Sequence, residues 1–296
     1  MQWRTLVISS PGKLSLKNRQ LLIESENRLT LPLEDIFTIV LESPQVILSS
    51  SLLSALPEYS ITLITCNSSH IPNGVLYPFT PYCRQLPVIN KQIAMSSTIK
   101  KRIWQKIVIV KILNQAKCVD KSNNRGGEYL RKIAKTVKSG DSTNVESKAA
   151  LFYFRALFGD GFNRNLAVWQ NSALNYGYAI IRSGIARALV AHGLIPALGV
   201  HHCSELNNFN LADDLIEPYR ALVDYQVYQI GVFNNPEVFD KSIKIKLVDL
   251  LYQDIKLSNY SQSKIKLLAS FEIQTESLIR TINNLKIQEL SLPGFI

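Results

Sequence analysis

The stretch Tyr77-Pro78-Phe79-Thr80-Pro81 separates two kinds of sequence in this 296-residue chain. Its two prolines disfavour helix on their N-terminal side. Short runs rich in β-branched residues precede it, and long stretches with helical periodicity follow it. At about 100–200 residues per domain, the length predicts one or two domains. We expect residues 1–77 and 84–296 to form them.

Before this stretch, the sequence predicts a β-rich domain. Turn-prone residues such as Asn27 and Pro72-Asn73-Gly74 separate the apolar runs. A short helix is expected at 51–56. The predicted strands cover residues 5–8, 21–23, 29–31, 37–41 and 61–65.

After this stretch, the periodicity predicts helices nearly to the end of the chain. The expected fold class is therefore α+β, with a small β-rich N-terminal domain followed by a larger all-helical domain. The predicted helices cover roughly residues 88–118, 126–138, 143–158, 166–192, 211–231, 236–256 and 261–286.

The net charge of +10 favours an anionic partner, and nucleic acid is the commonest one. Residues 91–138 contain thirteen Lys or Arg and two acidic residues, whereas residues 1–75 contain five and six. DNA binding is therefore expected mainly in the second domain. The four cysteines form no CxxC pair, which fits a reduced, cytoplasmic protein. No signal peptide or membrane span is expected.

A glutamate lies on the predicted buried face of the helix over 143–158. At the 3.6-residue period, Glu146 shares this face with Ala150, Tyr153 and Leu157. A buried, unpaired carboxylate is very unfavourable, so Glu146 requires a nearby cation or a bound proton. The alternative is a glutamate at the start of a helix, stabilised there by the helix dipole.

Two adjacent histidines, His201 and His202, precede an asparagine-rich stretch at 207–210. Adjacent side chains point in different directions, so at most one of them is expected to face a shared pocket. Cys203 follows directly, but a structural zinc site needs a second ligand pair that this stretch lacks. The alternative is an ordinary surface loop.

Acidic residues recur at helical spacing just before a proline. Glu217 is three residues from Asp214 and four from Asp213, so both pairs lie on neighbouring turns of one face. Like charges so placed repel each other unless a metal or another cation joins them. Pro218 removes one helical hydrogen bond and can bend the helix. The alternative is a solvated acidic face with Arg220 as its partner.

These three segments together contain ligands suited to one divalent ion. Two carboxylates and an imidazole suit Mg²⁺ or Mn²⁺, and the imidazole favours Mn²⁺. An acidic pocket in a basic protein is typical of metal-assisted phosphoryl chemistry on nucleic acid. The residues alone therefore predict a nuclease-like activity.

The same segments resemble the larger of the two universal CRISPR adaptation proteins, a CRISPR-associated integrase and endonuclease, in its type II branch. Ser147 replaces the family's usual Gly, and Glu217 replaces the commoner Asp, but neither change removes a ligand. The resemblance runs in order over most of the chain, at residues 3–5, 145–150, 153–154, 157–159, 175–178 and 209–220.

The resemblance implies that Glu146, His202 and Glu217 are catalytic and bind Mg²⁺ or Mn²⁺. His201 is the second choice for the histidine, and Asp214 is the second choice for the third ligand or a group that supports it. The implied reaction inserts short foreign DNA into a CRISPR array, by attack of a 3′-hydroxyl on a phosphodiester of the repeat. With water as the nucleophile, the same site would cleave DNA.

The implied partners are double-stranded DNA, as captured fragments and as the CRISPR repeat, and a second copy of the chain, which would form a homodimer through the β-rich domain. A small CRISPR adaptation protein would join them in a larger complex in the prokaryotic cytoplasm, and the type II effector nuclease is a further candidate. Three alternatives remain open: a structure-selective DNA repair nuclease, a non-catalytic DNA-binding scaffold and a protein-interaction module. The candidate DNA-binding residues, each alternatively a solvated helix position, are Lys100, Lys101, Arg102, Arg131 and Lys132.

Overall fold

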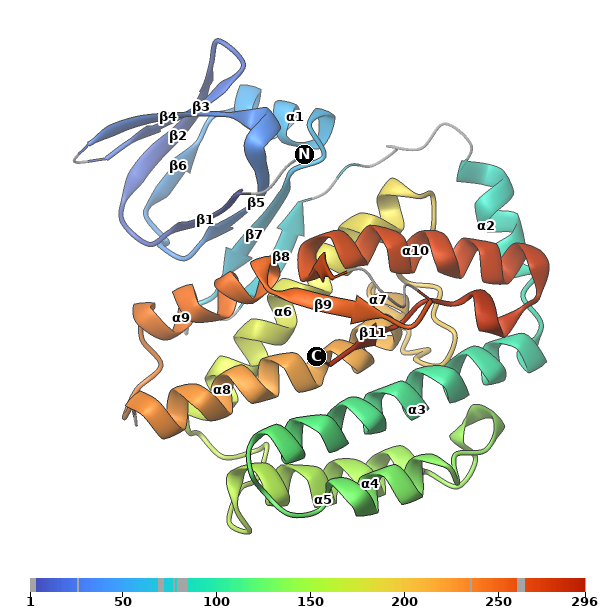
Figure 1. Cartoon of the computed structure of the whole chain (residues 1–296). Helices are drawn as coiled ribbons and strands as arrows, with labels where there is room; N and C mark the ends of the chain where they lie inside the picture. Colours follow the sequence, from blue (N-terminus) through green and yellow to red (C-terminus); the bar gives the residue numbers. More distant parts are fainter. Residues whose placement is uncertain are drawn as a thin grey trace. The chain divides into compact units, whose positions relative to one another are not determined.

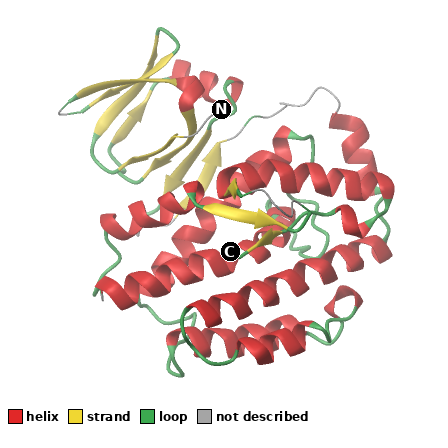
Figure 2. Cartoon of the chain, viewed as in Figure 1, coloured by secondary structure: helices red, strands yellow, loops and turns green. Residues whose placement is uncertain are grey.

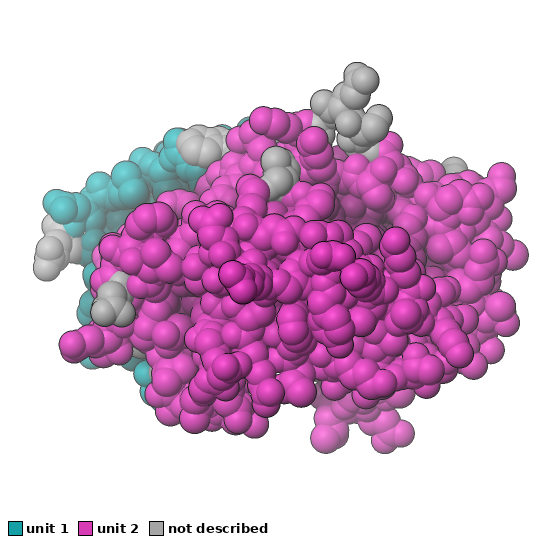
Figure 3. Space-filling model, turned by 60° about the horizontal axis from the view of Figure 1, so that its bottom comes forward, with its two compact units in different colours: residues 1–85, 187–194 teal, residues 86–186, 195–296 magenta. Residues whose placement is uncertain are grey.

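The computed structural model describes residues 4–25, 27–68, 72–76, 78, 85–234, 236–259 and 264–295. The chain divides into two compact units, 1–85 with 187–194 and 86–186 with 195–296 (Figure 3). The first is rich in strands and the second in helices (Figure 2), which confirms the predicted α+β class. Except for Pro78, the stretch 77–81 lies outside the described residues, so the domain boundaries expected there stay a prediction.

Two four-stranded sheets make up most of the first unit (Figure 1). One has the order β4-β3-β2-β6 and the other β1-β5-β7-β8. In the second sheet β1, β5 and β7 run parallel, and β8 is antiparallel to β7. The strands are β1 (Arg4–Ile8), β2 (Gly12–Lys17), β3 (Gln20–Glu24), β4 (Arg28–Pro32), β5 (Ile36–Leu41), β6 (Val46–Leu48), β7 (Thr62–Cys66) and β8 (Pro72–Leu76), with a 3₁₀ turn η1 (Leu33–Asp35) before β5.

The core of the first unit forms around β5, in which all six residues are buried. A strand covered on both faces is largely apolar, and five of the six residues of this one are apolar, Thr38 being the exception. Helix α1 (Ser50–Glu58) adds Leu52 and Leu56 to the same core. The Ser49 hydroxyl caps this helix by accepting a hydrogen bond from the Leu52 backbone N–H. The short helix predicted at 51–56 is therefore confirmed.

All five predicted strands are present, but β2, β6 and β8 were not predicted from the apolar runs. Pro72-Asn73-Gly74, expected to be a turn, instead begins β8. This strand lies at the edge of its sheet, where a proline costs no ladder hydrogen bond. The turn between β2 and β3 is made by Asn18 and Arg19, both with positive φ, as a two-residue hairpin requires.

Helices dominate the second unit, and none of the described helices is both long and apolar enough to cross a membrane. The N-terminal group is α2 (Gln85–Ile93), α3 (Ser97–Lys121), α4 (Gly127–Ala134), η2 (Ser139–Asp141), α5 (Val145–Phe158) and α6 (Trp169–Ala191), whose last turns belong to the first unit. The C-terminal group is α7 (Asn210–Ile216), η3 (Glu217–Tyr219), α8 (Arg220–Asn234), α9 (Lys241–Val248), η4 (Asp249–Tyr252), α10 (Leu267–Asn284) and η5 (Ile287–Glu289).

Helix α3 is the central element of the second unit and contacts α4, α5, α8 and η3. Trp104, Ile107 and Ile112 on it are buried. The single helix predicted over 88–118 is divided into α2 and α3, because Ser96 caps α3 by accepting a hydrogen bond from the Ile99 backbone N–H at 3.4 Å. α3 also carries three buried polar side chains, Lys111, Asn114 and Gln115.

The helix predicted over 211–231 is interrupted at Pro218. α7 ends just before it, the 3₁₀ turn η3 follows, and α8 continues from Arg220. The Asn114 amide on α3 donates to the Pro218 carbonyl at 2.7 Å. The helix is thus interrupted at the proline, and Glu217 lies on a 3₁₀ turn that contacts α3.

The second unit also contains a three-stranded sheet of order β10-β9-β11, so it is not all-helical as expected. The strands are β9 (Asp254–Leu257), β10 (Ile265–Lys266) and β11 (Pro293–Gly294). The helix predicted over 236–256 was too long, because β9 alternates exposed and buried residues with the two-residue period of a strand.

Two lysines of α3 hold the C-terminal segment of the chain. Lys106 Nζ donates to the carbonyl oxygens of Ile287 at 3.0 Å and Leu290 at 2.6 Å. Lys117 Nζ donates to the Phe295 carbonyl at 2.9 Å. These lysines thus donate hydrogen bonds to backbone carbonyls of the C-terminal segment.

Candidate functional site

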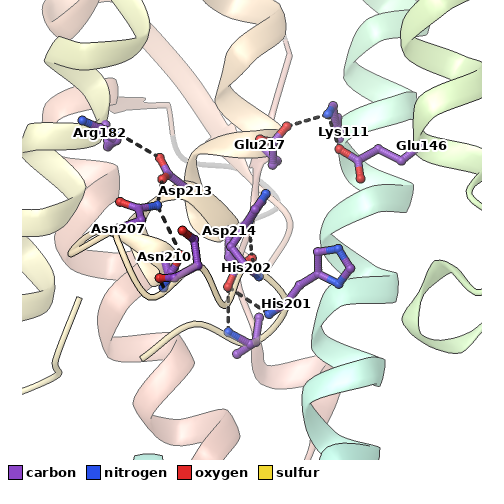
Figure 4. A network of polar contacts seen from close by, with 12 residues as sticks. Lys111, Glu146, Arg182, His201, His202, Asn207, Asn210, Asp213, Asp214 and Glu217 are labelled. Carbon is purple, nitrogen blue, oxygen red and sulfur yellow. Dashed lines mark hydrogen bonds and ion pairs between the residues drawn. The ribbon is translucent and has the colours of Figure 1, made fainter. Parts of the chain in front are cut away.

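Two of the predicted ligands meet at a lysine (Figure 4). Lys111 Nζ lies 2.5 Å from Glu146 Oε1 and 2.5 Å from Glu217 Oε2. Because both oxygens contact the same nitrogen, they are no more than twice that distance apart. Glu146 and Glu217, 71 positions apart by their numbers, therefore face a single cation-sized position.

Glu146 is held at the first turn of α5 by a capping aspartate. Asp141 accepts hydrogen bonds from the backbone N–H groups of Val145 and Glu146, each at 2.9 Å. The buried face of α5 is centred on Val145, Ala149 and Tyr153, so Glu146 lies at its edge rather than at its centre. Its side chain is 23% exposed, which leaves it accessible to a ligand while it still pairs with a buried lysine.

Glu217 is the more deeply buried of the two carboxylates. Its Oε1 accepts from Arg220 Nε at 2.8 Å, and its Oε2 contacts Lys111. Burial by itself would raise the pKa of Glu217, but Arg220 and Lys111 outweigh burial and lower the pKa to about 2. Glu217 is thus a carboxylate at neutral pH. Arg220, expected as its partner in the alternative of a solvated acidic face, pairs with it in the interior instead.

Asp214 organises the loop that carries the two histidines. Its Oδ2 accepts from the Val200 and His201 backbone N–H groups at 2.7 and 3.1 Å. Its Oδ1 accepts from the His202 backbone N–H at 3.1 Å and lies 2.8 Å from His202 Nδ1. Asp214 is fully buried and both of its oxygens are engaged, which fits a group that supports a ligand.

His202 has one ring nitrogen fixed by this carboxylate. The hydrogen bond to Asp214 raises the pKa of His202, and burial opposes it. With Nδ1 engaged, Nε2 is the ring nitrogen left to bind a ligand, as in the carboxylate–histidine–metal arrangement of many metal sites. The His202 side chain is 40% exposed, so a ligand can reach it.

His201, the second choice for the histidine ligand, packs elsewhere. Its ring stacks on buried Trp104 with centroids 4.0 Å apart and an interplanar angle of 2°. In Figure 4 it points away from Asp214. This stacking against α3 gives His201 a packing role.

A buried polar network behind the carboxylates joins the helices that carry them. Asp224 on α8 accepts hydrogen bonds from Tyr153 on α5 at 2.8 Å and from Tyr178 on α6. Burial raises the pKa of Asp224 to about 6, although the two tyrosine hydroxyls oppose the rise. Arg220 lies over the Tyr178 ring, 4.5 Å from its centroid, so the network adjoins the Glu217 ion pair.

The donor set suits a divalent ion, although within the described ranges no three His, Cys, Asp or Glu side chains are already grouped around one point. Two carboxylates already share one cation, the Lys111 ammonium. Apart from that ion pair, Glu217 Oε2 accepts no hydrogen bond from the described residues. Glu146, Glu217 and the free nitrogen of His202 are oxygen and nitrogen ligands of the type that Mg²⁺ and Mn²⁺ accept.

The family model described as CRISPR associated protein Cas1 matches residues 6–162 and 163–246 of the chain. A CRISPR-associated endonuclease Cas1 from Neisseria meningitidis serogroup C (strain 8013) is 41% identical over 301 residues, covering 100% of this chain and 97% of the relative. The chain belongs to the Cas1 family. The resemblance inferred from the sequence is thereby confirmed at the level of the family, while the type II branch stays a prediction.

Solved structures share the Cas1 fold at low sequence identity. A structure titled "Casposase bound to integration product" superposes with a TM-score of 0.79 at 16% identity, over 96% of this chain and 92% of that one. A chain of a Cas6-RT-Cas1–Cas2 complex gives a TM-score of 0.78 at 18% identity, over 98% of this chain and 36% of that one. These likenesses establish the fold of this Cas1 protein.

The predicted DNA-binding residues of this Cas1 protein fall into two groups. Arg131 pairs with Asp120 at 2.5 Å, and Lys132 pairs with Glu128 at 2.9 Å. Both pairs are exposed, and their positive charges are already compensated by neighbours.

Lys100, Lys101 and Arg102 form the second group, with no ion pair to any residue in the described part of the chain. Lys100 and His202 both line a pocket of about 420 Å³. Lys100 is therefore the candidate placed best to contact a phosphate near the site.

Proposed function

We propose that this Cas1 protein is a divalent-metal-dependent DNA endonuclease and integrase that inserts short foreign DNA into a CRISPR array. In joining, a DNA 3′-hydroxyl attacks a phosphodiester of the repeat, a new phosphodiester forms and the repeat strand breaks. In cleavage, water takes the place of the hydroxyl. The observation that carries the proposal is the pair of carboxylates, Glu146 and Glu217, that face one cation. The third ligand would be His202, which Asp214 anchors.

Glu146, Glu217 and His202 would hold the ion, which is Mg²⁺ or Mn²⁺. When bound, such an ion lowers the pKa of a water or hydroxyl nucleophile and neutralises charge on the attacked phosphate. Arg220 keeps Glu217 ionised, so that it can act as a ligand at neutral pH. Asp214 fixes the orientation of the His202 ring. These contacts preorganise the ligands before DNA arrives.

The partners follow from the family and from the related structures. The Neisseria relative is named an endonuclease, and related structures are described as a casposase bound to an integration product and a Cas6-RT-Cas1–Cas2 complex. We propose double-stranded DNA as substrate, both as captured fragments and as the CRISPR repeat. We also propose a homodimer formed through the β-rich unit, assembly with the small adaptation protein and, in a type II system, contact with the effector nuclease.

The test is strand joining with and without metal. The purified protein and its small partner are incubated with a labelled DNA fragment and repeat-containing DNA, in Mn²⁺, Mg²⁺ or EDTA. We expect a joined product with either metal and none with EDTA. Cleavage without joining would indicate a repair nuclease, and binding without metal-dependent product would indicate a scaffold. Absence of DNA binding at low salt would indicate a protein-interaction module.

DNA affinity should also fall steeply as salt increases. On a log–log plot, the slope for duplex DNA is about −0.9 per phosphate contacted. Lys100→Ala is expected to make the slope shallower by about 1, because Lys100 lines the same pocket as His202 and its charge is left to contact a phosphate. The control is Lys132→Ala, which removes an ammonium already paired with Glu128. A salt-independent affinity would contradict electrostatic binding.

A further inference from the structure

Lys111 lies where the proposed metal ligands converge. Its ammonium contacts one oxygen of Glu146 and one of Glu217, and its side chain is only 9% exposed. Arg220 takes the other oxygen of Glu217 and leaves Oε2 to Lys111. The three ion pairs together leave two carboxylates balanced by two cations in the interior.

Without Lys111, the two carboxylates would repel each other. One oxygen of each lies close to the other, and Glu217 is almost fully buried, which strengthens the interaction between like charges. Removing one partner of a buried ion pair is strongly destabilising, because a charge is left uncompensated. In the folded protein the Lys111 ammonium, which contacts both Glu146 and Glu217, offsets this repulsion.

We propose that Lys111 is an internal counter-cation, which holds Glu146 and Glu217 in position in the metal-free protein and competes with the divalent ion for them. The inference rests on the proposed function, because it concerns the same metal site. It makes Lys111 a positioning residue, since it acts through the two carboxylates. The ammonium and a divalent ion need the same oxygens, so one must leave when the other binds.

This competition has a measurable size. An apparent affinity falls in proportion to the fraction of molecules that are competent to bind. If the ammonium occupies the carboxylate pair in more than about nine molecules in ten, the apparent dissociation constant for the metal rises about tenfold or more. Replacing Lys111 with an uncharged residue should therefore lower the apparent dissociation constant for the metal by the same factor.

The experiment measures Mn²⁺ binding and thermal stability of the full chain without DNA. Lys111→Met keeps an unbranched, flexible stem and removes the charge. We expect Lys111→Met to bind Mn²⁺ at least about tenfold more tightly than the unmodified protein, by calorimetry or by the EPR signal of free Mn²⁺. We also expect a lower Tm without metal and a larger rise in Tm when Mn²⁺ is added.

Lys106→Met is the matched control. Lys106 lies on the same helix and is partly buried, but it donates to backbone carbonyls rather than to carboxylates. This variant should lose stability without any change in Mn²⁺ affinity. If Lys111→Met does not fold without metal, the double variant with Glu146→Gln removes one of the repelling charges and should fold. Failure of the double variant to fold overturns the proposal.

The outcomes separate the two proposals. If the unmodified protein binds Mn²⁺ and Lys111→Met binds it no more tightly, Lys111 is not a competitor and only this inference fails. If the Tm of Lys111→Met without metal equals that of the unmodified protein, Lys111 does not hold the two carboxylates, and again only this inference fails. If neither protein binds Mn²⁺ or Mg²⁺, the proposed metal-dependent function fails, and the inference fails with it.

Discussion

Glu146→Gln is expected to lower the rate of DNA joining at least about a hundredfold while the protein stays folded. An amide cannot replace the negative charge of a metal ligand, but it keeps the size of the side chain and an oxygen that can accept a hydrogen bond from Lys111. The partial exposure of Glu146 also limits the effect on stability. The measurements are the initial rate of strand joining in Mn²⁺ and the urea midpoint of unfolding.

The control for this variant is Glu128→Gln on α4. Glu128 is exposed and pairs with Lys132 at the surface, away from the two carboxylates that share Lys111. It should leave the joining rate within about twofold, since surface ion pairs contribute little. Joining at the unmodified rate in Glu146→Gln would remove Glu146 from the proposed site.

Asp214→Asn is expected to lower the free energy of unfolding by about 2–6 kcal/mol. The Asp214 carboxylate accepts three hydrogen bonds from backbone N–H groups. The asparagine side chain would place an NH₂ group, itself a donor, where one of the accepting oxygens was. Each buried donor left without an acceptor costs about 1–3 kcal/mol, and at least two would be affected. Joining should fall as well, because His202 loses the contact that orients its ring. Urea unfolding and the joining assay measure the two effects.

The neighbouring Asp213→Asn is the control. Asp213 accepts from the Asn207 amide at 2.7 Å and pairs more loosely with Arg182, at 3.5 Å. Its replacement should cost about 1 kcal/mol or less. Equal losses of stability in the two variants would show that Asp214 does not anchor the histidine loop.

Strong local patterns in the sequence predicted much of the fold. The β-branched runs predicted β5 and β7, and the 3.6-residue period predicted α5 and most of α6. The missed elements depend on pairing with distant residues. β9, for example, lies between β10 and β11, and the sequence of residues 254–257 alone does not predict which strands pair with it. Pro218 did indicate the interruption of the helix, where the 3₁₀ turn η3 replaces the α-helix.

The site was predictable only in part. The residues and the family resemblance singled out Glu146, His202, Asp214 and Glu217, and the structure brings Glu146 to Glu217 and Asp214 to His202. Lys111 was missed, because a lysine in a basic stretch predicts a surface that binds DNA.

Other charged side chains near the site were also expected to be at the surface or on another face. Lys106 and Lys117, in the same basic stretch as Lys111, also make internal hydrogen bonds. Asp213, expected to share a face with Glu217, contacts Arg182 instead. The net charge of a stretch does not predict these contacts, because they depend on which side chains point into the interior of the fold.

The attachment of residues 287–295 to α3 has a consequence for how the protein is made. Ribosomes release a chain from its N-terminus, so α3 emerges long before the segment that Lys106 and Lys117 hold. Until that segment has been translated, these two lysines lack their acceptors and the helix that carries Lys111 is incompletely anchored. The internal hydrogen bonds of α3 are therefore complete only once residues 287–295 have been synthesised.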